Sequence, residues 1–194
     1  MSKGMTVGIY GGSFDPIHTG HAMVANFVAQ CNVVDEVRIM VSRRNPIKQN
    51  SPVATDEERL EMASLVASAC ENVKVEDVEM SMPAPSFTID TLRRLKTENP
   101  EHDFKIIIGS DSLEKFHLWK DHDLILKDFG VIVYPRPGYP LPSIETEGMT
   151  FLNGAPEFSI SSSLIREYVA SGWNINYFVP LSVSQYIKQH NLYR

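Results

Sequence analysis

The sequence predicts an α/β protein with a single doubly wound, mostly parallel sheet and helices on both faces. Short apolar segments alternate with segments of helical periodicity along nearly all of the 194 residues, which is typical of consecutive strand–helix units with right-handed crossovers. The largely apolar run at residues 104–108 suits a central strand that is covered on both faces. We expect one domain over residues 1–194, with a C-terminal helical part (about 159–194) packing on the sheet.

Composition excludes several classes of function. Hydrophobic residues make up 43% of the chain and charged residues 22%, as in ordinary globular proteins. The net charge of −6 argues against a general nucleic-acid binder. Cys31 and Cys70 fall on predicted helical faces and are expected to be buried free thiols, as in a reducing compartment. The sequence shows no signal peptide and no apolar run of membrane-spanning length, so we expect a cytoplasmic protein without a membrane partner.

The chain is organised around its first strand, loop and helix. An apolar strand from Val7 to Tyr10 is followed by G-G-S-F-D-P-I-H-T-G-H at residues 11–21. A helix should come next, because apolar residues then recur at helical spacing. These are Met23, Val24, Phe27, Val28 and Cys31.

This loop and helix start predict a phosphate site. A helix N-terminus offers unpaired N–H groups and a partial positive charge. His18 and His21 are three residues apart, so on a helical turn they share one face, and Gly20 permits close approach of another segment. A lone Gly-Gly is usually only a turn, and a lone histidine usually lies in the core or on the surface. The full string favours the phosphate site, although it has neither the Gly-x-x-x-x-Gly-Lys nor the Gly-x-Gly-x-x-Gly spacing.

The remaining elements follow in order. Strands are expected near 37–41, 73–78, 131–134 and 149–152. Helices are expected at 55–69 with a Thr55/Glu58 capping box, at 89–98, from 113 through 119 toward 126, at 161–171 ending at Gly172, and from Ser182 to the C-terminus.

A second anion site is predicted near the C-terminus. Ser161, Ser162 and Ser163 open a helix, where serines are by default caps. Arg166 lies one turn further along and can reach the same anion as the serine hydroxyls. Two such helix starts, far apart in the sequence, indicate a polyphosphate held from two sides.

Other polar residues should meet at the carboxyl ends of the strands, the ligand edge of open α/β sheets. Gly109 and Asp111 follow the central strand, and Arg136 lies in a proline-rich loop. The loop after residue 41 carries Arg43, Arg44 and Lys48, which hold a phosphate or are simply solvated. Trp119 is more often a core residue than a platform for a ligand.

The candidate site residues indicate a reaction that is catalysed by positioning the substrates and stabilising charge. The sequence contains neither a nucleophile elbow nor a cysteine in a cationic loop, so we expect no covalent intermediate. Phosphoryl and nucleotidyl transfer proceed mainly by positioning and charge stabilisation. An acceptor phosphate oxygen would attack the α-phosphorus of a nucleoside triphosphate in line and expel pyrophosphate. Mg²⁺ would bind mainly through phosphate oxygens and water, with no protein residue predicted as a metal ligand.

Several motifs together resemble one family. The string at residues 11–21 resembles the H-x-G-H signature of the nucleotidyltransferase superfamily, and in particular its nicotinate mononucleotide adenylyltransferases. I-S-S-S-L-I-R (160–166) resembles the second signature, with Ser163 where threonine is commoner. N-P-I-K (45–48), S-F-T-I-D-T-L (86–92), G-S-D (109–111), Trp119 and R-P-G (136–138) also match. The resemblance covers almost the whole chain.

The resemblance implies a Rossmann-like fold and the reaction of ATP with nicotinate mononucleotide to give deamido-NAD and pyrophosphate, a step of NAD biosynthesis. It also implies roles for individual residues. The catalytic set is His18, His21 and Arg166. ATP would be bound by these three and by Gly11, Gly12, Ser13, Phe14, Gly20, Gly109, Asp111, Ser161, Ser162 and Ser163. The acceptor would be bound by Asn45, Lys48, Thr88, Trp119 and Arg136, with the backbone amides near Thr88 and Trp119 recognising the nicotinate carboxylate.

Other functions rank lower. Phosphopantetheine adenylyltransferases share the histidine motif but lack the Trp and R-P-G segment, and cytidylyltransferases are further away. The amide acceptor, nicotinamide mononucleotide, is nearly isosteric with the acid. A catalytically silent nucleotide sensor would be expected to have lost His18, His21 or Arg166, and a dehydrogenase would need the Gly-x-Gly-x-x-Gly spacing. The sequence predicts no particular oligomeric state.

Overall fold

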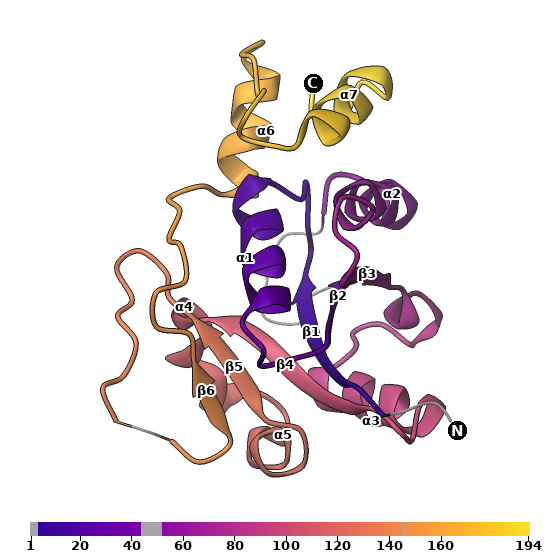
Figure 1. Ribbon diagram of the computed structural model, residues 1–194. Helices are drawn as coiled ribbons and strands as arrows, with labels where there is room; N and C mark the ends of the chain where they lie inside the picture. Colours follow the sequence, from indigo (N-terminus) through magenta and orange to yellow (C-terminus); the bar gives the residue numbers. More distant parts are fainter. Residues whose placement is uncertain (1–3, 44–51, 145) are drawn as a thin grey trace.

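The computed structural model describes residues 4–43, 52–144 and 146–194 and contains one six-stranded sheet (Figure 1). The strand order is β3-β2-β1-β4-β5-β6, and every neighbouring pair is parallel. The predicted doubly wound fold is confirmed. The strands are β1 (Thr6–Gly12), β2 (Glu36–Val41), β3 (Val73–Glu76), β4 (Asp103–Gly109), β5 (Val131–Tyr134) and β6 (Met149–Phe151).

Helices cover both faces of the sheet (Figure 1). The α-helices are α1 (Thr19–Gln30), α2 (Asp56–Ala67), α3 (Thr88–Glu98), α4 (Ser110–Leu113), α5 (His122–Asp128), α6 (Ser162–Ala170) and α7 (Leu181–Gln189). Short 3₁₀ helices lie at η1 (Val78–Ser81) and η2 (Phe116–Leu118). One apolar cluster joins α1, α2, α6 and α7 to the sheet, and a second joins α3 and α5 to the opposite face.

Three local predictions were wrong in detail. The stretch from 113 to 126 is not one helix, because Trp119 is extended and Asp121 adopts a left-handed φ of 52°, which separates η2 from α5. Val78 lies in η1 and not in β3. The last helix begins at Leu181 behind Pro180, so Ser182 lies inside it and is not its cap. By contrast, Thr55 and Glu58 form the predicted capping box of α2.

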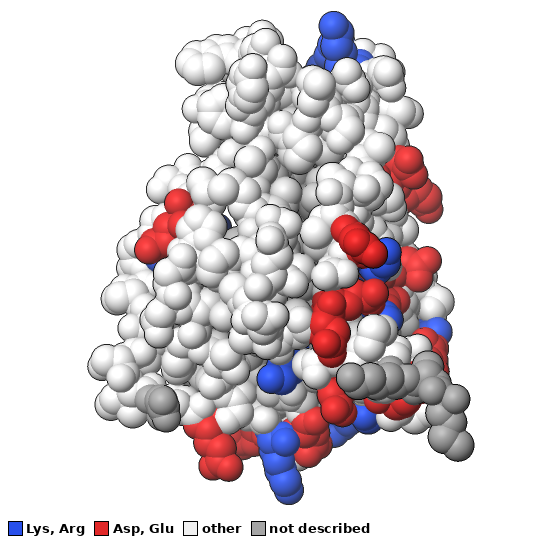
Figure 2. Space-filling view, viewed as in Figure 1, with Lys and Arg blue, Asp and Glu red and all other residues white. Residues whose placement is uncertain are grey.

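The surface and the cysteines agree with the composition. Acidic and basic side chains gather mainly over the lower part of the face in Figure 2, whereas the upper part over α1 and α6 is largely uncharged. Cys31 and Cys70 are partly buried free thiols. None of the helices in the described segments is both long and apolar enough to cross a membrane.

Candidate active site

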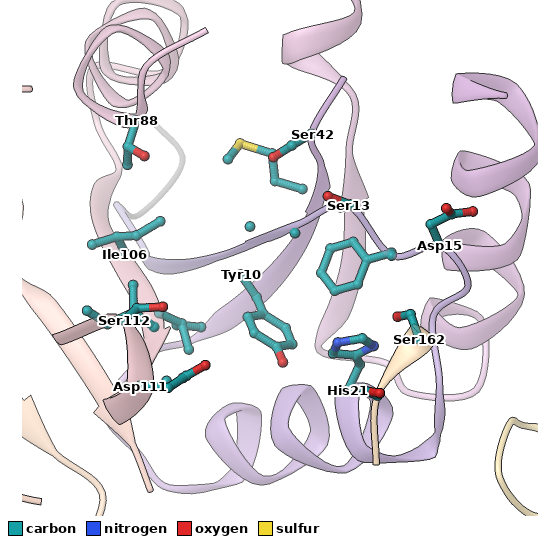
Figure 3. A pocket seen from close by; sticks show the side chains of 18 of the residues that line it. Tyr10, Ser13, Asp15, His21, Ser42, Thr88, Ile106, Asp111, Ser112 and Ser162 are labelled. Carbon is teal, nitrogen blue, oxygen red and sulfur yellow. The ribbon is translucent and has the colours of Figure 1, made fainter. Parts of the chain in front are cut away.

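A pocket of about 650 Å³ opens at the carboxyl ends of β1 and β4. Strand order reverses between these two strands, and ligands of open α/β sheets bind at such a switch point. Most of the predicted site residues line this pocket (Figure 3). They are Gly11, Gly12, Ser13, Phe14, His18, His21, Thr88, Gly109, Asp111, Trp119, Arg136, Ser161, Ser162, Ser163 and Arg166.

Of the predicted residues that the structure describes, Gly20 does not line the pocket. Gly20 is buried directly behind the wall. Asn45 and Lys48 lie outside the described residues, as does Arg44. Arg43 is engaged in protein contacts, since its Nε pairs with Asp56 at 3.1 Å and its guanidinium donates to the Met82 carbonyl at 3.3 Å.

The two histidines close the N-terminus of α1 reciprocally. The backbone N–H of His21 donates to Nδ1 of His18 at 3.3 Å, and the N–H of His18 donates to Nδ1 of His21 at 3.2 Å. The rings stack with centroids 3.5 Å apart. A nitrogen that accepts an N–H carries no proton, so each neutral ring holds its proton on Nε2. Both side chains therefore present Nε2–H as a donor.

His18 is a neutral donor at physiological pH. Its side chain is almost fully buried, and burial, with a smaller contribution from the charge of Arg136, lowers its pKa to about 4. It therefore contributes a hydrogen bond rather than a positive charge. Figure 3 shows His21 beside Ser162, where it faces the start of α6.

The start of α6 supplies the second set of donors. Ser161 caps the helix by accepting the N–H of Leu164 at 3.2 Å. The guanidinium of Arg166 donates to the Ser163 hydroxyl at 3.1 Å and to the main-chain carbonyl of Asp15 at 2.6 Å. The predicted convergence of Arg166 and the serines on the first loop is confirmed.

Close packing between the two helix starts requires a glycine. A Cβ on Gly20 would lie 2.9 Å from Cγ2 of Ile160 and 3.2 Å from the His18 ring. The Ser162 hydroxyl also crosses this junction and donates to the Pro16 carbonyl at 2.9 Å. The segment before α6 thus lies directly against the start of α1.

Asp111 and Arg136 form the opposite wall. Their charged groups are 3.8 Å apart. Ser110 fixes the Arg136 loop, because its hydroxyl donates to the Tyr139 carbonyl at 2.6 Å and accepts the Arg136 N–H at 2.9 Å. A hydroxyl-rich or basic ligand group could pair with Asp111, and an anion with Arg136.

Figure 3 shows Thr88 at the far end of the pocket from His21, and Trp119 also lines the pocket. Thr88 is the first residue of α3, so its backbone N–H is free of intrahelical partners. Trp119 both lines the pocket and packs against Phe116 of the core, with ring centroids 5.4 Å apart. The core and ligand interpretations of Trp119 are therefore compatible.

Sequence reasoning missed a pair of tyrosines on the pocket floor. The hydroxyls of Tyr10 and Tyr134 are 3.2 Å apart, and both rings are buried. Figure 3 shows the Tyr10 hydroxyl between Asp111 and His21. A pair of hydroxyls uses one proton for its mutual bond, which leaves a second O–H to donate into the pocket. From the sequence, Tyr10 is predicted only to lie in the first strand.

Arg59 was also missed. Its side chain is fully buried, and its guanidinium donates to the carbonyls of Ser13 at 2.6 Å and Ser42 at 2.7 Å and pairs with Asp56. It therefore ties together the loops that follow β1 and β2. The sequence does indicate that Arg59 is buried, because it precedes Met62, Ala63 and Val66 at the spacing of one buried helix face.

Comparisons with known proteins agree with this site. Residues 9–168 match the cytidylyltransferase-like family model. A "Probable nicotinate-nucleotide adenylyltransferase" of Bacteroides fragilis is 40% identical over 97% of this chain and 94% of its own. One of the same name from Flavobacterium johnsoniae is 34% identical over 98% and 100%.

A solved structure supports the fold. The nicotinic acid mononucleotide adenylyltransferase of Plasmodium falciparum, complexed with NaAD, superposes with a TM-score of 0.77 at 22% identity and covers 97% of both chains. The chain belongs to the cytidylyltransferase-like family and, within it, to the nicotinate-nucleotide adenylyltransferases.

Proposed function

We propose that this protein transfers the adenylyl group of ATP to nicotinate mononucleotide, which yields deamido-NAD and pyrophosphate in NAD biosynthesis. The observation that carries the proposal is the meeting of two helix N-termini, with their histidine, serine and arginine donors, in one pocket at the switch point of the sheet. The near full-length relatives with this activity in their names support the choice of acceptor.

The reaction is a direct displacement. A phosphate oxygen of the acceptor forms a bond to the α-phosphorus while the bond from that phosphorus to the bridging oxygen breaks, and pyrophosphate leaves with the electron pair. The Nε2–H groups of His18 and His21 stabilise charge on the transferred group. Arg166, the hydroxyls of Ser161 and Ser163 and the backbone N–H of Ser162 hold the β- and γ-phosphates, since the Ser162 hydroxyl donates to the Pro16 carbonyl. Gly11, Gly12, Ser13 and Phe14 shape the loop around the nucleotide.

Mg²⁺ fits this site as an ion that arrives with the triphosphate. The groups at the two helix starts are N–H and O–H donors, which suit phosphate oxygens. The nearby carboxylate of Asp15 already accepts three protein hydrogen bonds. Bound through phosphate oxygens and water, Mg²⁺ would supply further neutralisation of the phosphate charge.

The remaining residues divide between the two substrates. Gly109 and Asp111 contact the adenosine ribose, and Gly20 allows the helix starts to approach. Thr88, Trp119 and Arg136, together with Asn45 and Lys48, bind the mononucleotide, with backbone amides near Thr88 and Trp119 reading its carboxylate. We also propose that residues 1–194 act as one domain in the cytoplasm, without nucleic-acid or membrane partners.

Pyrophosphate release tests the proposal. Purified protein with ATP and Mg²⁺ is offered nicotinate mononucleotide, nicotinamide mononucleotide and phosphopantetheine in parallel. We expect strong preference for the first. Release with phosphopantetheine alone would keep the chemistry and overturn the acceptor. Silence with all three, from folded protein that still binds ATP, would favour a nucleotide sensor.

A further inference from the structure

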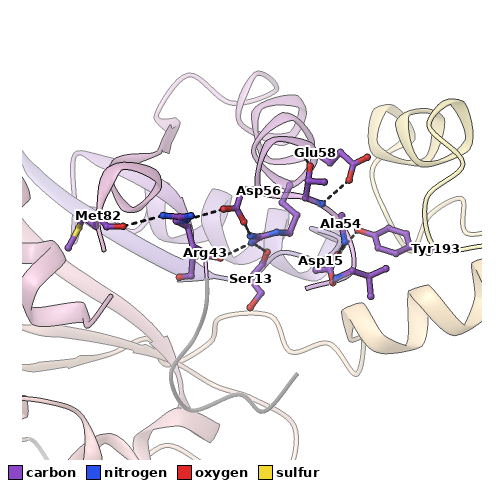
Figure 4. A network of polar contacts seen from close by, with 12 residues as sticks. Ser13, Asp15, Arg43, Ala54, Asp56, Glu58, Met82 and Tyr193 are labelled. Atoms are coloured by element: carbon purple, nitrogen blue, oxygen red, sulfur yellow. Dashed lines mark hydrogen bonds and ion pairs between the residues drawn. The ribbon is translucent and has the colours of Figure 1, made fainter. Parts of the chain in front are cut away.

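The carboxylate of Asp15 joins three parts of the chain, which are its own loop, residues 53–54 and Tyr193 (Figure 4). It is buried in the loop between β1 and α1. Oδ2 accepts the N–H of Val53 at 2.7 Å, and Oδ1 accepts the N–H of Ala54 at 3.1 Å and the hydroxyl of Tyr193 at 2.8 Å. Tyr193, the penultimate residue, is therefore connected to the loop that precedes the catalytic histidines.

The hydroxyl of Tyr193 is a permanent donor. Burial, reinforced by the negative charge of Asp15, raises its pKa well above the usual range of tyrosine. The side chain is only 8% exposed. A protonated phenol beside a carboxylate forms a charge-assisted hydrogen bond, which is stronger than a neutral one.

Arg166 lies on the other side of the same carboxylate. Its guanidinium donates to the main-chain carbonyl of Asp15 at 2.6 Å, but its nearest approach to the carboxylate, at Oδ2, is 3.8 Å. That separation is too long for a hydrogen bond. Asp15 is thus held close to Arg166 without forming the bidentate pair that an arginine and a carboxylate prefer.

We propose that Tyr193 is a positioning residue that keeps the Asp15 carboxylate turned away from Arg166. The terminal torsion of an aspartate is broad, so three donors are needed to fix the carboxylate. Loss of the Tyr193 hydroxyl would leave Oδ1 with one donor, and the carboxylate would rotate onto the guanidinium. Arg166 would then be partly neutralised and less able to bind the β- and γ-phosphates. The proposal rests on the role of Arg166 in the proposed function.

Tyr193→Phe in the full chain tests this role, because it removes the hydroxyl and keeps the ring in the core. We expect the KM for ATP and the Kd for inorganic tripolyphosphate each to rise by about tenfold, while the KM for nicotinate mononucleotide stays unchanged. Tyr186→Phe is the matched control, since its hydroxyl makes no hydrogen bond within the described segments. It should behave as wild type in both assays.

A double-mutant cycle with Arg166→Gln separates positioning from stability. If Tyr193 acts through Arg166, Tyr193→Phe will cause little further rise in the KM for ATP in the Arg166→Gln background. An equal rise in both backgrounds, or equal rises in the KM values of both substrates, would overturn the proposal. Wild-type protein that binds tripolyphosphate but transfers no adenylyl group would contradict the proposed function instead, and the binding assay would still decide the role of Tyr193.

Discussion

The two helix starts that face the pocket are built in different ways. The N-terminus of α1 is closed by two residues within its own first turn, His18 and His21, and is buried against the sheet. The N-terminus of α6 is capped by the exposed Ser161 and is held in place by bonds to residues 146 and 151 positions away. Both starts are anchored to distant segments, because Thr19 of α1 donates to the carbonyls of Tyr177 and Phe178. The difference lies in the caps, which are two imidazoles at α1 and a serine at α6.

The two helix starts should therefore respond differently to substitution. In the proposed reaction, a change at the start of α1 alters catalysis and helix capping together, because the same two imidazoles do both. A change at the start of α6 alters how firmly α6 is docked, and its serine and arginine donors move with it. The following substitutions separate these effects.

The largest effect is expected at His21. His21→Ala should lower kcat by a hundredfold or more, because a donor to the transition state is lost. His21→Gln is the control, since a glutamine at this position can still accept the N–H of residue 18 and keep the cap. Its thermal midpoint should match wild type while its kcat stays low. If His21→Gln had the kcat of the wild type, the role of His21 would be limited to capping α1.

Arg166→Gln should have the next largest effect. Loss of a charged, forked donor should lower kcat/KM for ATP on the order of tenfold or more, with little change in the KM of the mononucleotide. Steady-state kinetics with each substrate varied in turn measures this. Arg94→Gln, which removes a half-exposed arginine from the far side of α3, provides the control. A loss shared equally by both substrates would contradict the assignment to the phosphates.

The pKa of His18 predicts a pH dependence of stability. It is about 4 in the folded protein against 6.5 for a free histidine, so between these values the unfolded chain binds the extra proton. Stability should therefore fall as the pH is lowered through this window, by about 1 kcal/mol between pH 7 and 5.5. Urea unfolding at both pH values measures it. His18→Asn, which keeps a capping side chain, should show a smaller difference, and an unchanged difference would assign it to other groups.

The smallest effect is expected at Ser162. Ser162→Ala removes the hydroxyl that donates to the Pro16 carbonyl and should lower the free energy of unfolding by about 0.5–1.5 kcal/mol. The KM for ATP should rise severalfold, because α6 is docked less firmly. Ser171→Ala at the other end of the same helix is the control. If Ser162→Ala changed the KM for ATP no more than this control, the hydrogen bond from Ser162 to Pro16 would have no role in ATP binding.

The difference between local patterns and long-range contacts explains how much could be predicted from the sequence. Alternating strands and helices, the histidine spacing and the serine cap are local patterns, and each was confirmed. The positions of Asp15 and Tyr193, which are 178 residues apart, depend on the packing of the C-terminal segment. Arg59 was missed because a helical arginine is normally solvated. The interruption of the predicted helix at Trp119 and Asp121 was missed because the spacing of apolar residues carries no information about the backbone angles of single residues.

Because Gly20 has no side chain, Ile160, which precedes α6, can pack directly against the start of α1. A Cβ on Gly20 would lie 2.9 Å from Cγ2 of Ile160, so in Gly20→Ala the Ile160 side chain or the segment that carries it would have to shift. In the proposed binding mode a triphosphate contacts both helix starts, whereas a single phosphate would need only one. In the proposed reaction, the spacing of the two helix starts would therefore select ligands by the length of their phosphate chain as well as by their charge.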